Sequence, residues 1–159
     1  AGATLSPLFL QDPRTGSAGA LFEALSLLNA DEATAEWPLA DKTEAQEGLD
    51  LIVAGLKASR ATEADGAFCA EDKLADDRMP DDHIGLMLSL LATLTEERPE
   101  LVEEYLSEHL LPWAPHYLGL LEVCAEHPFY KGLALLTKAT LKGAQDELSL
   151  VVIEPRFYR

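Results

Sequence analysis

Prolines divide the second half of this 159-residue sequence into short segments, each with helical periodicity. Pro99 and Pro115 suit the first turn of a helix, because the missing N–H of proline is not needed there. Pro112 stops or kinks the preceding helix at Leu111, and Pro128 begins another helix that runs through residue 148. One face of that last helix carries Phe129, Leu133, Leu136 and Thr140. A chain punctuated in this way predicts short helices joined by tight turns.

The sequence before Pro99 has the same periodicity. Residues 17–30, 43–58 and 83–97 each place apolar side chains three or four positions apart, which is typical of an amphipathic helix. Thr43 is the expected N-cap of the second of these helices, because Gln46 follows it at the spacing of a capping box.

Strand signals are almost absent from the sequence. The one strand-like run, residues 150–153, has no obvious partner, so we expect an extended apolar tail packed on the helices. Pro80 lies just before the helix at 83–97, and Asp81 or Asp82 is available to cap it. The sequence therefore predicts an all-α fold, a compact multi-helix bundle joined by short loops.

The charge balance restricts the partners that this chain can bind. Acidic residues number 28 and basic residues 12, which gives a net charge of −16. Sequence-independent binding of nucleic acid needs Lys and Arg to displace phosphate counterions, so the balance argues against it. It also disfavours docking on an anionic membrane. If charge recruits a partner, that partner is basic.

The two cysteines, Cys69 and Cys124, form neither a disulfide framework nor a zinc motif, and this usage fits a reducing compartment. The first residues lack the basic and apolar regions of a secretory signal peptide. No apolar run reaches the roughly 18–20 residues that a membrane span needs. We therefore expect a soluble, cytoplasmic protein.

Familiar catalytic motifs are absent from the sequence. It contains no glycine-rich phosphate loop, no GxSxG nucleophile turn and no HExxH zinc motif. Two prolines separate His109 from His116 and spoil a simple metal pair, so we expect no metal site. His83 follows Asp81 and Asp82, and three hypotheses stay open for it: proton transfer, a local hydrogen bond at a helix start, or a role in binding.

Residues 59–82 are rich in acidic side chains and have weak periodicity. They form either a solvated acidic loop or an acidic collar beside a peptide groove, and composition leaves both interpretations open. Two aromatic pairs, Trp113 with Tyr117 and Phe129 with Tyr130, are expected to lie mainly in the core.

Three motifs follow one another in the sequence: MPDDHIGLMLSLLATL (79–94), SEHLLPWAPHYLGLLEV (107–123) and EHPFYKGLALLTKATL (126–141). Their order and spacing resemble the TorD/DmsD family, whose pattern is an E-P-x-D-H hinge, then H-L-x-P-W, then S/H-P-F-Y. The AEWPL run at 35–39 and the C-terminal EPRFYR resemble the DmsD branch of that family.

The resemblance implies one all-helical domain of TorD-like type over residues 1–159, with a hinge loop near 76–83. Within it, the N-terminal helices occupy residues 1–58 and an acidic linker occupies 59–82. The C-terminal helices and the extended tail occupy residues 83–159.

The resemblance also implies a chaperone rather than an enzyme. Family members bind the twin-arginine leader of a molybdoenzyme precursor, such as a DMSO or TMAO reductase, and hold it back from the twin-arginine (Tat) translocase until its cofactor is inserted. The implied partners are that leader and components of the translocase, with no cofactor of the chaperone's own, no nucleic acid and no stable membrane insertion. A monomer and a domain-swapped dimer both stay open. The alternative is a generic helical adaptor without Arg-Arg specificity.

Carried onto this sequence, the family's leader-binding hinge falls on Asp82 and His83, with Asp81 beside them. Met79 stands where the family has a glutamate, which is a departure from the pattern. The other matching residues are expected to hold the hinge and the helices together: Pro80, His109, Pro112, Trp113, Pro128, Phe129 and Tyr130.

The middle of the sequence departs further from the family. Family members carry an aromatic, glycine- and proline-rich stretch there, and nothing in residues 58–79 matches it. Either the protein lacks this stretch, or residues 59–82 are what remains of a longer linker. We expect the second, and an intact mass well above 17.3 kDa would support it.

Overall fold

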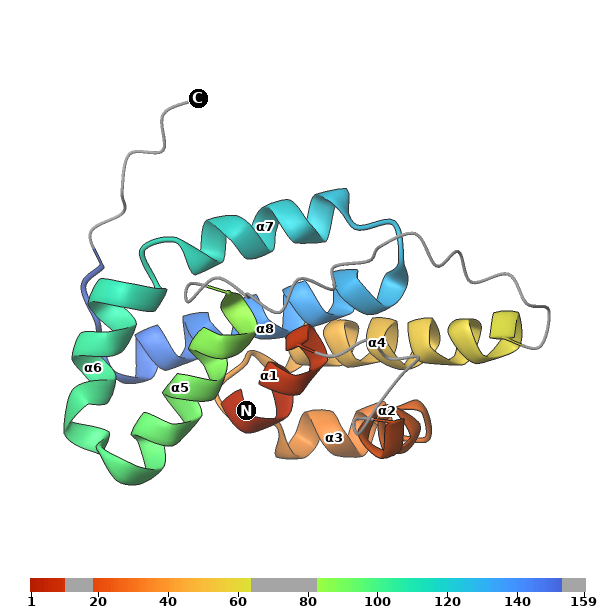
Figure 1. Ribbon diagram of the computed structural model, residues 1–159, viewed down its shortest axis with the longest axis horizontal. Coiled ribbons are helices and arrows are strands. Elements are labelled where there is room, and N and C mark those ends of the chain that lie inside the picture. Colours follow the sequence, from red (N-terminus) through yellow and green to blue (C-terminus); the bar gives the residue numbers. More distant parts are fainter. Residues whose placement is uncertain (11–18, 64–82, 153–159) are drawn as a thin grey trace.

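The computed structural model describes residues 1–10, 19–63 and 83–152 (Figure 1). Those residues form helices and connecting turns, without a strand, which confirms the predicted all-α class. The elements in chain order are α1 Gly2–Leu10, α2 Gly19–Ser26, α3 Ala30–Glu36, α4 Lys42–Glu63, α5 Ile84–Glu97, η1 Pro99–Leu101, α6 Val102–Glu104, η2 Tyr105–Leu110, α7 Ala114–Cys124 and α8 Pro128–Glu147. None of these helices is long and apolar enough to cross a membrane.

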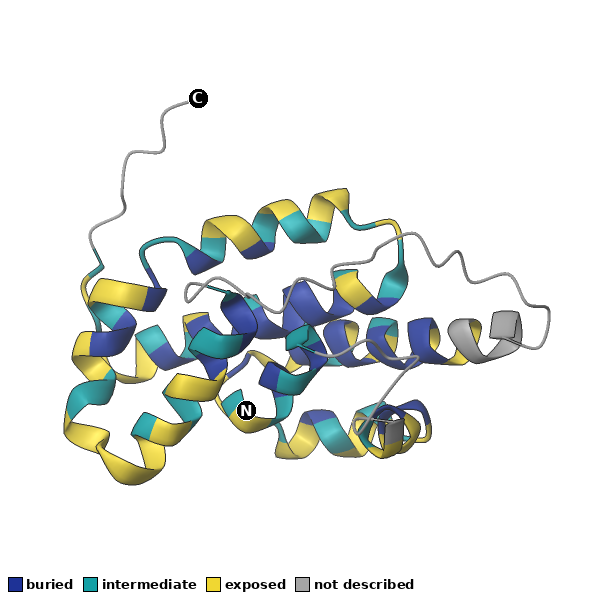
Figure 2. Ribbon diagram, viewed as in Figure 1, coloured by how far each residue is buried: buried dark blue, intermediate teal, exposed yellow. Residues whose placement is uncertain are grey.

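The two longest helices, α4 and α8, pack against each other and form the centre of the molecule. α2 and α3 pack on the other side of α4, α7 packs on α8, and α1 pairs with α5 (Figure 1). Buried side chains gather on α4 and α8 (Figure 2). They include Leu49, Ile52, Leu56, Phe129, Leu133 and Leu136. The apolar stripes predicted for residues 43–58 and for the helix after Pro128 are therefore the core.

Small residues let the backbones of α4 and α8 approach closely. A Cβ atom on Gly132 would lie 2.5 Å from the carbonyl oxygen of Gly48 and 2.7 Å from the Cβ of Leu51. No side chain fits between the helices at this crossing, so the large apolar residues on either side of it interdigitate.

Two details at the start of the chain differ from the predictions. Residues 17–30 do not form one helix: α2 ends at Ser26, and Asn29 caps the separate helix α3 by accepting a hydrogen bond from Asp31 N at 3.2 Å. The prediction that Thr43 is the N-cap of α4 is also wrong. The helix begins at Lys42, and Asp41 Oδ1 accepts a hydrogen bond from Thr43 N at 2.9 Å. The carboxylate is the stronger acceptor at the positive end of a helix.

Residues 99–110 do not form the single regular helix expected after Pro99. A 3-10 turn and one α turn lead into η2, a π-helical segment in which Leu111 N donates to Leu106 O at 2.8 Å. Tyr105 is buried in this segment, and its hydroxyl donates to Met87 O on α5 at 3.0 Å. The predicted stop before Pro112 is correct, because the segment ends at Leu110.

Residues 150–152 after α8 belong to no helix or strand, and part of this run packs on the helices, as predicted for the apolar tail. Leu150 and Val152 pack against the core, while Val151 between them is exposed. Residue 153 and those after it lie outside the described part of the chain.

The close approach of α4 and α8 predicts opposite effects of one substitution at two helical glycines. Gly132→Ala should lower the free energy of unfolding by about 1–3 kcal/mol, because its new methyl group overpacks the crossing. Gly119→Ala on α7, where the new Cβ would meet nothing within 4 Å beyond its chain neighbours and the backbone of its own helix, should raise the free energy of unfolding by about 0.5–1 kcal/mol through helix propensity. Urea unfolding measures both, and equal effects would contradict the packing.

Tyr105 predicts a loss of stability at high pH. Burial raises the pKa of Tyr105 from its ordinary 10.0 to about 12, so the unfolded state ionises first. The stabilisation is therefore complete below pH 10 and is lost as the pH rises from 10 toward 12. Tyr105→Phe should lower the free energy of unfolding by about 0.5–1.5 kcal/mol at pH 8 and should remove the loss of stability at alkaline pH. Urea unfolding at pH 8 and at a pH between 10 and 12 measures both effects. The control Tyr117→Phe, at an exposed tyrosine, should keep the loss.

Candidate functional site

His83 is the predicted leader-binding hinge residue that the structure describes, and it lies immediately before α5. Its Nδ1 atom accepts a hydrogen bond from Gly85 N at 3.1 Å, which makes His83 itself the N-cap of the helix. Accepting this bond requires an unprotonated Nδ1. Asp81 and Asp82, expected as caps and as leader contacts, lie outside the described residues, as do Pro80 and the acidic segment after residue 63.

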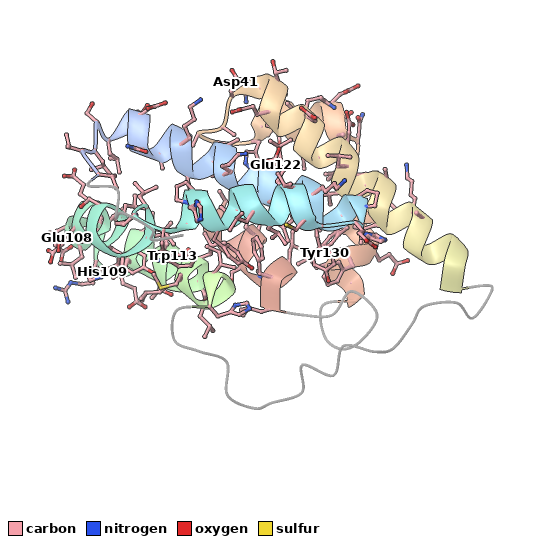
Figure 3. All side chains as sticks on the ribbon, turned by 90° about the horizontal axis from the view of Figure 1, so that it is seen from above. Asp41, Glu108, His109, Trp113, Glu122 and Tyr130 are labelled. Atoms are coloured by element: carbon pink, nitrogen blue, oxygen red, sulfur yellow. The ribbon has the colours of Figure 1, made fainter. Side chains whose placement is uncertain are left out.

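The predicted hinge residues His109, Pro112 and Trp113 meet at the turn between η2 and α7. Trp113 Nε1 donates to the carbonyl oxygen of His109 at 2.8 Å, and the Trp113 ring stands edge-on to Tyr117 with ring centroids 6.0 Å apart. The His109 side chain is exposed beside Glu108 at one end of the molecule (Figure 3). These contacts close the turn after the proline.

The aromatic residues after Pro128 divide between core and surface. Pro128 is the first residue of α8, and Phe129 is buried against Phe22 with ring centroids 5.8 Å apart. Tyr130, by contrast, is 39% exposed, and Tyr117 on the outer face of α7 is 40% exposed. The prediction of core positions is therefore wrong for these two tyrosines. Each packs its ring on a neighbouring aromatic ring, Tyr117 on Trp113 and Tyr130 on Phe129.

Sequence reasoning missed a second histidine cap. His127 Nδ1 accepts from Phe129 N at 3.3 Å at the start of α8, just as His83 does at the start of α5. The proline after His127 is the sequence signal, because it marks the first helical position.

A largely apolar cavity of about 410 Å³ lies between α1, α5 and the C-terminal half of α8. Its apolar walls are formed by Leu5, Leu88, Leu91, Leu141 and Leu148, with Leu39 from the loop before α4. Two carboxylates, Glu96 and Glu147, also line it. Cavities of this size, apolar with a few polar groups, are the usual binding sites of ligands.

A second, acidic hollow of about 480 Å³ adjoins this cavity at the start of α4 and the end of α8. It shares Leu39 and Glu147 with the cavity and adds Asp41, Glu44 and Asp146. Its basic residue is Lys142. Asp41 is labelled on this part of the molecule in Figure 3, far from His109. The structure thus brings carboxylates beside an apolar space, at a place where sequence reasoning proposed no site.

The signal for this place in the sequence is the AEWPL run, whose last residues lie between the cavity and the hollow. Among the described residues, no group of three or more His, Cys, Asp or Glu side chains could hold a metal ion. The arrangement offers charge and apolar surface to a ligand.

Comparison with known proteins finds relatives among chaperones, although no family model matches the chain. The chain is 50% identical over 80 residues to the "Probable Tat proofreading chaperone DmsD" of Haemophilus influenzae, covering 50% of this chain and 39% of the relative. It is 40% identical over 80 residues to the "Tat proofreading chaperone DmsD" of Salmonella typhi, covering 49% and 39%. It is 39% identical over 93 residues to the "Chaperone protein YcdY" of Escherichia coli, covering 55% and 50%.

These relatives carry the names of chaperones, and the described part of this chain is helical. The matches confirm the resemblance to the TorD/DmsD family over about half of the chain. The matched region spans half or less of the length of these relatives.

The cap at α5 predicts how stability responds to substitution of His83. His83→Ala should lower the free energy of unfolding by about 1 kcal/mol, because Gly85 N loses its acceptor, whereas His83→Asn keeps a capping side chain and should lose less. His109→Ala is the control, because that exposed side chain caps no helix. It should change the free energy of unfolding by about 0.5 kcal/mol at most. Equal losses in the Ala and Asn variants, measured by urea unfolding, would contradict the capping role.

Proposed function

We propose that this chain is a cytoplasmic chaperone that binds the twin-arginine leader of a molybdoenzyme precursor of the DMSO or TMAO reductase type. In this proposal it assists cofactor insertion and proofreads the precursor before Tat export, and it catalyses no reaction. The observation that carries the proposal is the identity of 40–50% with proteins named Tat proofreading chaperones.

The chemistry of a twin-arginine leader supports the proposal. Such a leader carries two guanidinium groups and an apolar stretch, so its receptor should offer carboxylates beside apolar surface. The apolar cavity and the acidic hollow next to it have this combination. The net charge of −16 would also speed the encounter with a cationic peptide.

Asp81, Asp82 and His83 remain proposed leader contacts. His83 lies at the start of α5, and the later turns of the same helix line the cavity. A peptide that follows α5 could therefore contact both His83 and the cavity. The His83→Asn variant, which keeps a capping side chain, separates a direct contact with the leader from the role of His83 as a cap.

One observation favours a second function, that of a general protein adaptor. The outer face of α7 carries exposed apolar side chains from Tyr117, Leu120 and Val123. Exposed apolar patches of this kind mark surfaces that bind other proteins. An adaptor acting through this face would have no requirement for two arginines in its partner.

Calorimetric titration with a twin-arginine leader peptide and its Lys-Lys counterpart tests the proposal. We expect the Lys-Lys peptide to bind about tenfold more weakly, because lysine cannot reproduce the bidentate fork of arginine. Raising the salt concentration should weaken binding of the first peptide modestly, since exposed charges are screened over about 8–10 Å. Equal binding of the two peptides would favour the adaptor, and binding of neither would contradict the proposal.

A further inference from the structure

We infer that the leader is held in two parts, with an apolar side chain in the cavity between α1, α5 and α8 and its arginines in the adjoining acidic hollow. This inference rests on the proposed function and adds the place and division of the site. The argument uses three features of the structure: an unpartnered hydroxyl, a strained residue and two carboxylates at an unfavourable helix end.

The first feature is the hydroxyl of Thr137, which lies in the lining of the cavity. Thr137 is 0% exposed, and its Oγ1 atom has no hydrogen-bond partner. Thr140, one turn further along α8, instead donates to Leu136 O at 2.7 Å and accepts from Trp37 Nε1 at 3.0 Å. Buried polar groups are nearly always paired, so an unpaired hydroxyl in a cavity wall points to a partner on the ligand. A backbone group of a bound peptide would supply that partner.

The second feature is Leu39, which lies between the cavity and the hollow. The backbone φ of Leu39 is 71°, and Ala40 N donates a hydrogen bond to Pro38 O at 2.8 Å across it. This geometry defines a tight γ-turn, which residues other than glycine rarely adopt. The turn persists because Gly143 on α8 lies directly against the Leu39 carbonyl, where any side chain would collide. Leu39 is nevertheless 48% exposed. Strain that the surrounding structure maintains is typical of ligand-binding positions, and here it presents an apolar side chain to both spaces.

The third feature is the charge at the C-terminal end of α8. Asp146 and Glu147 lie in the last turn, which contains no basic residue. A carboxylate is unfavourable there, because the helix dipole places partial negative charge at that end. Glu147 and Glu96 also have no ion-pair or hydrogen-bond partner among the described residues. Carboxylates placed at a cost to the helix and left unpaired are suited to guanidinium groups of a partner.

The two parts of the site adjoin each other, as the arginines and the apolar stretch do in the peptide. The hollow and the cavity share Leu39 and Glu147, so an arginine in the first would be followed directly by chain entering the second. A peptide that carries only charge, or only apolar side chains, would fill half of the site.

Titration calorimetry with the twin-arginine leader tests the acidic half. The double variant Asp146→Asn/Glu147→Gln should bind about tenfold or more weakly, since each lost bond is charge-assisted. This variant should fold at least as stably as the original, because it removes the unfavourable charges from the helix end. Glu108→Gln/Glu126→Gln is the matched control: it removes the same charge from exposed positions outside both spaces and should bind within about twofold.

Two substitutions test the apolar half. Ala92→Phe fills the cavity and should weaken binding about tenfold, while Ala54→Phe, at an exposed position on α4, should not. Thr137→Val should raise the melting temperature, because it removes an unsatisfied hydroxyl, and should weaken binding several-fold. A role of Thr137 in folding alone would change the melting temperature without changing affinity.

The outcomes separate this inference from the proposed function. If the original protein binds neither leader peptide, the proposed function fails and the inference fails with it. If it binds the twin-arginine leader and the site variants bind equally well, the inference alone is overturned. If Asp146→Asn/Glu147→Gln weakens binding of the leader and Ala92→Phe does not, the assignment of the cavity is overturned. If Asp146→Asn/Glu147→Gln weakens binding no more than the control Glu108→Gln/Glu126→Gln does, the assignment of the hollow is overturned.

Discussion

The close approach of α4 and α8 at Gly48 and Gly132 is the constraint on which the rest of the structure depends. Because these helices touch along their backbones, the flanking apolar residues form one continuous core, and α2, α3 and α7 cover the outer faces of the pair. The same crossing brings the end of α8 beside the start of α4. The acidic hollow is a direct consequence, since its carboxylates come from those two helix ends.

The remaining side of the pair is covered by α1 and α5, and the cavity lies where this cover meets α8. The loop before α4 is fixed there by the hydrogen bond from Trp37 to Thr140 and by the space that Gly143 leaves for the Leu39 carbonyl. One packing arrangement therefore sets both the fold and the juxtaposition of apolar and acidic surface. A receptor for a peptide with arginines and an apolar stretch needs that juxtaposition more than it needs any reactive group.

Much of the fold could be predicted from local periodicity. The apolar stripes of residues 43–58 and of the helix after Pro128 became the core, because helical spacing and proline positions act within a few residues. The cap by Asp41 is a local interaction as well, but the capping-box pattern at Thr43 and Gln46 favoured the wrong residue. The π-helical segment before Pro112 and the exposure of Tyr117 and Tyr130 depend on packing and were not predicted. The cavity could not be predicted either, because its walls come from residues far apart in the sequence. The hinge carboxylates Asp81 and Asp82 lie outside the described residues and stay a prediction.

The most direct test of the central claim is to locate the arginines of a bound leader on the protein. A twin-arginine peptide with a photoreactive group immediately after the second arginine would be cross-linked to the full chain, and the attachment site identified by mass spectrometry. The account predicts attachment within residues 38–44 or 142–148, around Leu39 and Glu147. Attachment confined to the outer face of α7 would contradict it, and attachment confined to residues 79–83 would overturn the placement of the arginines in the acidic hollow.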